Sequence, residues 1–212
     1  MSPRLSRAEQ NDRNRALLLS AALRVFLAHG YHAASLELIA DEAGFSKGAV
    51  YSRFESKADM FLALLTDRIA TRSAENASAV AELTSSGTVA GLIELAWWAE
   101  RVTPGWRLLV TEFRVLAARD PLLNRRYAEA HAATVDAVAV ILSAMAERDG
   151  LSLAVPVRRL AELLLAIETG IALEQLATPD GIDIRQAGVV LCQLAELLTP
   201  APATVTEEVR QS

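Results

Sequence analysis

Hydrophobic residues recur at helical spacing through most of the chain, and the alternation of apolar and polar residues that is typical of strands is absent. The first helical stretch runs from about residue 11 to residue 29, with Gly30 as its expected end. Two short helices follow between residues 33 and 57. Further helices are predicted at about 57–83, 88–101, 106–119, 121–148, 157–176 and 184–198. The pattern therefore predicts an all-α protein of about nine helices.

The first of the two short helices has a defined start and end. Ser35 can cap its free N–H groups, and apolar residues follow at helical spacing. Gly44, which adopts positive φ at low cost, would end this helix and turn the chain sharply. Ser46 can then cap a second helix from Lys47 to Phe54. This arrangement predicts a helix-turn-helix.

The second short helix offers little bulk on one side. Val50 and Phe54 would face the core, while Gly48, Ala49 and Ser52 would lie opposite them. A helix with such small side chains can enter a major groove about 12 Å wide, where its N-terminal residues usually reach base edges. Short helix-turn-helix units also occur as packing corners in proteins that bind no nucleic acid, which is the alternative.

Phosphate contacts are expected beside this helix. Ser56 to Asp59 resembles a capping box, and helix N-termini bind phosphate oxygens. Tyr51 can otherwise be a half-buried packing residue, and Lys47 a solvated lysine. The predicted DNA-binding residues are Ser35, Ser46, Lys47, Gly48, Ala49, Tyr51, Ser52, Arg53 and Lys57.

From about Asn14 to Phe61 the chain resembles the tetracycline-repressor (TetR) family of bacterial regulators. The resemblance rests on fixed residue types such as A-A-L-R-V-F at 21–26 and A-G-F-S-K-G at 43–48. It implies a three-helix DNA-binding head, an all-helical regulatory body, a homodimer and, usually, repression relieved by a small molecule. Ala49 stands where the family often has Thr, and Arg53 where it often has His, which affects the expected operator sequence.

Composition shifts divide the chain into three parts. We predict an N-terminal arm and DNA-binding domain at residues 1–57, a larger helical ligand-binding and dimerisation body at 58–199, and a disordered tail at 200–212. The net charge is −5, but residues 1–57 carry eight Lys or Arg against six Asp or Glu. Arginines at positions 4, 7, 13 and 15 lie before or at the first helix, where an arm can reach DNA. Arg4 and Arg7 can instead belong to a solvated, flexible tail.

The last two helices carry more apolar residues than a one-sided surface helix needs. We expect them to pair with the same helices of a second subunit, although they can instead cover the core of their own body. The residues expected at this dimer interface are Leu160, Leu164, Ile167, Ile171, Val190, Leu191, Leu194 and Leu198.

Aromatic and polar residues of the body are candidates for an effector pocket, since such pockets are mostly apolar with a few polar groups. The aromatic residues can instead be ordinary core, and the polar ones ordinary hydrogen-bonding groups. The candidate ligand-binding residues are Trp97, Glu100, Trp106, Glu112, Phe113, Tyr127, His131, Met145 and Glu168.

Other functional classes find little support in the sequence. Cys192 is a lone thiol, and neither a metal site, a cofactor motif nor a catalytic constellation is apparent, so we expect no enzyme and no cofactor. No signal peptide or uninterrupted membrane-length apolar run is visible, which favours a cytoplasmic protein without a membrane partner. The sequence therefore predicts a homodimeric repressor that binds a palindromic double-stranded DNA operator and is released by a small hydrophobic or amphipathic effector. The alternatives are an architectural or adaptor DNA-binding protein without an effector, and a helical-bundle enzyme.

Overall fold

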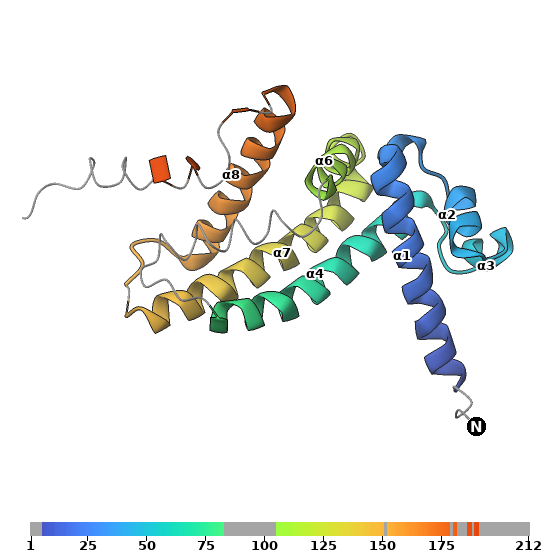
Figure 1. The fold of residues 1–212 in the computed structure, drawn as a ribbon, viewed down its shortest axis with the longest axis horizontal. Coiled ribbons are helices and arrows are strands. Elements are labelled where there is room, and N and C mark those ends of the chain that lie inside the picture. Colours follow the sequence, from blue (N-terminus) through green and yellow to red (C-terminus); the bar gives the residue numbers. More distant parts are fainter. Residues whose placement is uncertain are drawn as a thin grey trace, which may run out of the picture.

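The computed structural model describes residues 6–82, 105–150, 152–178, 180–181, 186–187 and 189–190. Within these ranges the secondary structure is helical and includes no strand, so the predicted all-α class is confirmed. Of the predicted helices, 88–101 lies outside the described residues and 184–198 lies mostly outside them, as does the tail at 200–212. The helices are α1 Arg7–Ala33, α2 Leu36–Ala43, α3 Lys47–Tyr51, α4 Lys57–Glu82, α6 Trp106–Ala117, α7 Pro121–Arg148 and α8 Val157–Ala177 (Figure 1).

Helix α1 is longer at both ends than its apolar stripe predicts. Ser6 and Glu9 form a reciprocal capping box, in which the Glu9 N–H donates to Ser6 Oγ at 3.2 Å and the Ser6 N–H donates to Glu9 Oε2 at 2.7 Å. The helix therefore begins at Arg7 and not near residue 11. Gly30, expected to end the helix, instead makes a kink with φ of 71°, and one further turn follows.

The two short helices follow the local rules closely. Ser35 and Ser46 cap α2 and α3, and Gly44 ends α2 in the left-handed conformation with φ of 71°. Helix α3 ends at Tyr51, three residues earlier than Phe54. There the Val50 carbonyl accepts from the N–H groups of both residues 53 and 54, at 2.9 and 3.0 Å, so the last turn tightens.

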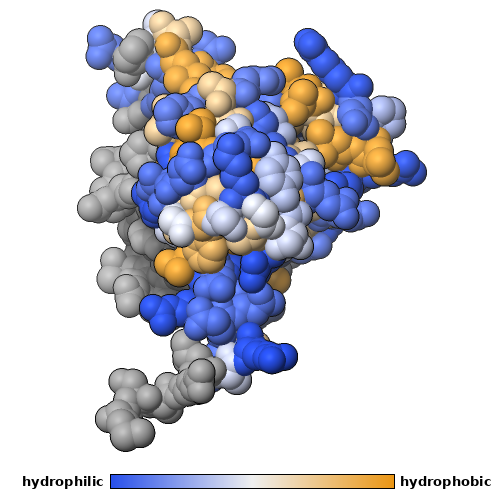
Figure 2. Space-filling model, turned by 90° about the vertical axis from the view of Figure 1, so that its right-hand side faces the viewer, coloured by the Kyte–Doolittle hydropathy of each residue, from blue (hydrophilic) through white to orange (hydrophobic). Residues whose placement is uncertain are grey.

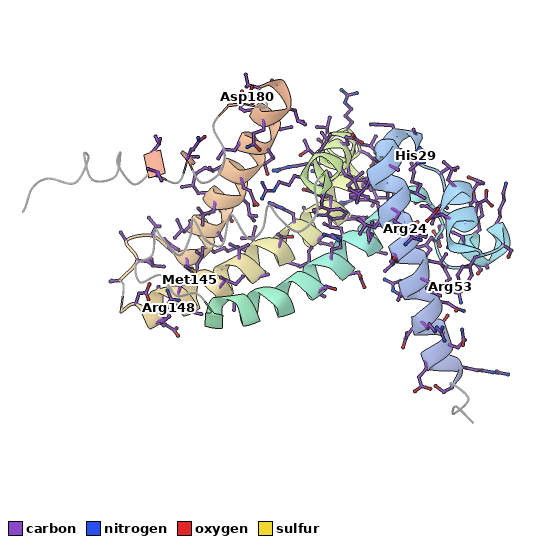
Figure 3. The ribbon with its side chains drawn as sticks, viewed as in Figure 1. Arg24, His29, Arg53, Met145, Arg148 and Asp180 are labelled. Atoms are coloured by element: carbon purple, nitrogen blue, oxygen red, sulfur yellow. The ribbon has the colours of Figure 1, made fainter. Side chains whose placement is uncertain are left out.

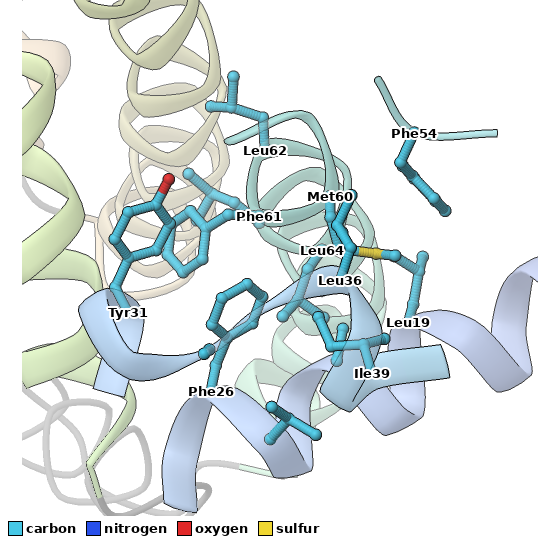
Figure 4. Packing of buried hydrophobic residues seen from close by; sticks show 14 of the residues in the cluster. Leu19, Phe26, Tyr31, Leu36, Ile39, Phe54, Met60, Phe61, Leu62 and Leu64 are labelled. Carbon is cyan, nitrogen blue, oxygen red and sulfur yellow. The ribbon is translucent and has the colours of Figure 1, made fainter. Parts of the chain in front are cut away.

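One hydrophobic cluster joins the three N-terminal helices to α4, α6 and the start of α7. Its centre is aromatic: Phe26 and Phe61 meet edge to face with ring centroids 5.4 Å apart (Figure 4). Phe61 also stacks on Phe113, with centroids 4.3 Å apart. Tyr31 is 4 % exposed and lies against all three of these rings. The head thus shares its core with the beginning of the body.

The rest of the body is built along α7, which packs against α4 on one side and α8 on another (Figure 1). A second cluster contains Val135, Leu142 and Ala161, with Leu160 and Leu164 partly buried against it. Leu160 and Leu164, which were expected at the dimer interface, therefore contact α7 of their own chain. This contact agrees with the alternative in which these helices cover the core of their own body.

Helices α1 and α7 are long enough and, on average, apolar enough to span a membrane. Neither contains an uninterrupted apolar run of that length, so the sequence analysis predicted no membrane span. Each helix also contributes buried residues to the clusters described above, for example Phe26 in α1 and Leu142 in α7. Charged side chains such as Arg24 lie on the exposed faces. Packing against neighbouring helices accounts for this composition without a membrane.

Candidate DNA-binding surface

The exposed side of α3 has the shape that the sequence predicts. Val50 and Phe54 are 0 % and 3 % exposed, so they anchor α3 in the core. Gly48 is exposed, and among the described residues no heavy atom outside its immediate neighbours lies within 4 Å of the position a Cβ would occupy. Figure 2 views the molecule from the side of α2 and α3, where pale and blue residues cover much of the lower half. This edge of α3 is open to a large partner.

Three serines cap the helices of this surface. Ser35 Oγ accepts from the Leu38 N–H and Ser46 Oγ from the Ala49 N–H, both at 3.2 Å. Ser56 Oγ accepts from the N–H of Asp59 at 3.1 Å and donates to its carboxylate at 2.8 Å. The predicted caps are confirmed, while the expected phosphate contacts at these helix ends stay predictions.

Tyr51 lies at the end of α3, and its side chain is 48 % exposed. Its hydroxyl donates to Glu37 of α2 at 2.6 Å. This hydrogen bond to a carboxylate raises the pKa of Tyr51 and lowers the pKa of Glu37. The proton of the Tyr51 hydroxyl therefore belongs to an intramolecular bond when no DNA is present.

Arg53 connects α3 to α1. Its guanidinium donates to the Ala49 carbonyl at 3.2 Å and to Asn11 Oδ1 at 2.8 Å, and Figure 3 shows it beside the N-terminal half of α1. An open groove of about 650 Å³ lies here, lined by Arg53 and by residues at the N-terminal end of α1. A neighbouring hollow of about 420 Å³ is lined by Asn11, Arg15, Ser52 and Arg53.

Asn11 and Asn14 of α1 were missing from the predicted site, and Arg7 and Arg15 were expected only as part of an arm. Arg7, Asn11 and Asn14 line the larger groove, and Arg15 lines the smaller one. The signal was present in the sequence, because residues spaced by three and four share one face of a helix. Extension of α1 to Arg7 places these groups beside α3, so Arg7 belongs to a capped helix and not to a flexible tail.

Lys57 stands at the start of α4, where its ammonium group donates to three backbone carbonyls at the end of α1. The acceptors are Tyr31 at 2.7 Å, His32 at 2.9 Å and Ala34 at 2.8 Å. The ammonium also lies 4.7 Å from the centroid of the Tyr31 ring. Burial lowers the pKa of Lys57. A phosphate contact by Lys57 would have to replace at least one of these hydrogen bonds, since an ammonium has three donors.

Four of the described candidates for the effector pocket, Trp106, Phe113, Tyr127 and His131, lie near one another in the body. Phe113 is fully buried and Tyr127 is 5 % exposed, whereas Met145 is fully buried toward the other end of α7 (Figure 3). Trp106 stacks near Phe61 with centroids 6.0 Å apart, and His131 stacks on Tyr127 at 5.9 Å. Burial, with Arg114 as a second cause, lowers the pKa of His131.

The two described acidic candidates are engaged within the chain. Glu112 accepts the Tyr31 N–H at 2.8 Å, and Glu168 pairs with Arg107 between α6 and α8. Trp97 and Glu100 lie outside the described residues. Contact of any of these residues with an effector stays a prediction.

The helix-turn-helix region is similar to known transcriptional regulators. Residues 18–64 match the family described as "Bacterial regulatory proteins, tetR family". The HTH-type transcriptional activator FasR of Mycolicibacterium smegmatis is 50% identical over 54 residues, which are 26% of this chain and 25% of FasR. The HTH-type transcriptional repressor AcnR of Corynebacterium glutamicum is 26% identical over 167 residues, which are 78% of this chain and 82% of AcnR.

Solved structures share the fold beyond the head. A putative TetR-family regulator from Mesorhizobium loti has a TM-score of 0.65 at 22% identity, covering 90% of this chain and 98% of that one. The regulator FadR from Bacillus subtilis, solved with stearoyl-CoA, has a TM-score of 0.64 at 16% identity, covering 84% and 96%.

An open helix-turn-helix on an all-helical body, together with these matches, indicates a helix-turn-helix transcriptional regulator. The head of the chain, over residues 18–64, matches the TetR family of these regulators.

Proposed function

We propose that this protein is a ligand-responsive transcriptional repressor that acts as a homodimer on a palindromic DNA operator. The observation that carries this proposal is the bare, exposed edge of α3 above buried Val50 and Phe54. The similarity to the repressor AcnR along most of the chain supports repression, whereas the activator FasR is matched along only a quarter of its length. The cytoplasm, where bacterial DNA lies, is the proposed location.

The proposed DNA contacts divide by position. Lys47, Gly48, Ala49 and Ser52 face the major groove, together with the helix N-terminus at Ser46. Backbone phosphates meet the N-terminus of α2 at Ser35 and the donors of Tyr51 and Arg53. The residues of α1 that line the two grooves extend this surface, because Arg7 and Arg15 carry positive charge there.

We assign residues 1–57 to DNA binding, 58–199 to regulation and dimerisation, and 200–212 to a disordered tail. Dimerisation is supported by α8, where Leu163, Leu173 and Leu176 are 56 %, 41 % and 57 % exposed. Val190 is 44 % exposed, whereas Ile171 and Ile167 pack around Ala187 of the same chain. The remaining expected interface residues Leu191, Leu194 and Leu198 lie outside the described residues. Exposed leucines on one helix are typical of a surface covered by a partner.

The proposed effector is hydrophobic or amphipathic. The aromatic residues Trp106, Phe113, Tyr127 and His131, with Phe61 of α4 between the first two, connect α6 to α7 and support an apolar ligand nearby. The neighbour FadR was solved with stearoyl-CoA, so a long-chain acyl-CoA is a concrete compound to test. An effector must bind the DNA-free form more tightly to release the repressor.

Fluorescence anisotropy with labelled DNA from the region flanking its own gene tests the proposal. We expect saturable binding that a scrambled duplex does not reproduce and that stearoyl-CoA or another apolar compound reverses. Sedimentation should show a dimer at micromolar concentration. Specific binding that no apolar compound relieves would favour the architectural or adaptor protein, and absence of specific binding would overturn the repressor.

A further inference from the structure

The kink in α1 leaves the backbone N–H of Tyr31 without a partner in its own helix, and a side chain of the body accepts its hydrogen bond. Gly30 has φ of 71° and ψ of 171°, so the helical hydrogen-bond pattern is interrupted there. The N–H of the next residue, Tyr31, donates instead to Glu112 Oε2 of α6 at 2.8 Å, across 81 positions of sequence. This contact joins the head directly to the body.

The site fits a carboxylate closely. A Cβ at Gly30 would lie 3.2 Å from Glu112 Oε2 and 3.4 Å from Oε1, so a side chain at position 30 would press on the carboxylate. The positive φ at this position independently favours glycine. Gly30 thus provides both the kink and the room for the acceptor.

The same segment is held from its other side by Lys57. Its ammonium binds the carbonyls of residues 31, 32 and 34, while Glu112 binds the N–H of residue 31. The ring of Tyr31 packs against Phe113 of α6 at 5.1 Å and Phe61 of α4 at 5.5 Å. An anion from α6 and a cation from α4 therefore hold residues 30–34, which lead directly into the cap of α2 at Ser35.

We infer that Glu112 and Lys57 are a pair of positioning residues that clamp residues 30–34 and transmit movement of α6 to the helix-turn-helix. This inference rests on the proposed function for its regulatory meaning. Interfaces in regulated proteins shift by about 1–2 Å, which is enough to break a hydrogen bond of ordinary length. Glu112 then acts in transmission and not as an effector contact, and Lys57 acts on the protein backbone and not on phosphate.

Hydrogen exchange of the full-length protein tests the clamp without DNA or effector. In Glu112→Ala the Tyr31 amide should exchange at least about tenfold faster, since its acceptor is gone. Glu112→Gln, whose amide oxygen can still accept, should retain part of the protection. Glu147→Ala at the far end of α7 is the matched control and should leave the Tyr31 amide unchanged. Equal protection in the wild type and Glu112→Ala would overturn the inference.

DNA binding then tests whether the clamp positions the head. A duplex selected from a random library with the wild-type protein serves as the probe. Glu112→Ala and Lys57→Ala should each weaken binding by about fivefold or more, with the salt dependence of binding unchanged, because no phosphate contact is lost. Thermal melting checks that both variants are folded at the assay temperature. If Glu112→Ala is not, Glu112→Gln replaces it, with a smaller expected loss of affinity because its amide oxygen can still accept the hydrogen bond.

The outcomes separate the clamp from the proposed function. A fall in the salt slope of about 0.9 in Lys57→Ala would assign Lys57 to a phosphate and overturn its role in the clamp. Wild-type affinity in both variants would overturn the inference while leaving the proposed regulator intact. Failure of the wild-type protein to select any duplex would overturn the proposed function, whereas hydrogen exchange would still decide whether the clamp exists.

Discussion

The hydroxyl of Tyr51 on α3 donates to the carboxylate of Glu37 on α2 at 2.6 Å, across the turn that joins the two helices. Both side chains lie at the surface that we propose for DNA, so a negative charge stands beside a predicted phosphate donor. The negative charge of Glu37 repels DNA phosphates. The same carboxylate accepts the hydrogen bond of the Tyr51 hydroxyl, which is then not available to a phosphate. We therefore expect Glu37 to oppose DNA binding in two ways.

Neutralising Glu37 should strengthen DNA binding. We expect Glu37→Gln to bind a labelled duplex about two- to fivefold more tightly near 50 mM salt, with the gain shrinking above about 0.5 M because salt screens surface charge. Anisotropy titrations across this salt range provide the measurement. Glu147→Gln removes an equal charge at the other end of the molecule and should change the affinity little. Weaker binding by Glu37→Gln would mean that the Tyr51 contact shapes the surface for DNA.

Adding bulk at Gly48 should separate folding from DNA binding. Because a Cβ there meets open space and the residue is helical, Gly48→Leu should leave the free energy of unfolding unchanged or raise it by about 0.5 kcal/mol. The same side chain would hold α3 away from the groove, so DNA affinity should fall at least about tenfold. Urea denaturation and anisotropy measure the two effects. Gly48→Ala is the conservative control, and a Gly48→Leu protein with undiminished affinity would show that this edge does not face the groove.

Local sequence signals predicted the DNA-binding helices well. Ser35, Gly44 and Ser46 act through neighbours within four residues, so the caps and the turn could be derived from spacing alone. The start of α1 was also encoded locally, by Ser6 and Glu9, although the apolar stripe concealed it.

Long-range partners were beyond the reach of sequence patterns. Lys57 binds carbonyls 23 to 26 positions away, and Glu112 binds an N–H 81 positions away. The spacing rules of helices extend over only three or four residues, and the acceptors belong to the backbone, which every residue carries. The roles of these two charges therefore emerge only from the packing of α1 against α4 and α6.

Removal of the Phe113 ring should destabilise head and body together. Phe113 is fully buried and contacts Phe61, Tyr31 and Tyr127, so Phe113→Ala should cost about 3–5 kcal/mol in the free energy of unfolding. Urea denaturation followed by circular dichroism measures the loss. Val115→Ala on the same helix is the control, since Val115 is 55 % exposed and its loss should change stability by less than about 0.5 kcal/mol. A small effect of Phe113→Ala would contradict the shared aromatic core.

Stability should fall between neutral and mildly acidic pH because of His131. Burial, and then the nearby Arg114, lowers the pKa of His131 from 6.5, while Glu162 opposes the shift. The unfolded chain therefore binds a proton at a higher pH than the folded protein does, so the stability present above pH 6.5 is lost as the pH falls through the folded pKa.

His131→Gln should abolish this part of the pH dependence when the free energy of unfolding is measured between about pH 7.5 and 5. The pKa values of Glu9 and Glu37 are lowered from 4.5, and that of Asp59 from 3.8, so these carboxylates change the stability only at a pH below those values and not in this range. If His131→Gln kept the full wild-type dependence of stability on pH, the acid sensitivity would arise elsewhere. The partial burial of His131 on α7 would then not control its protonation.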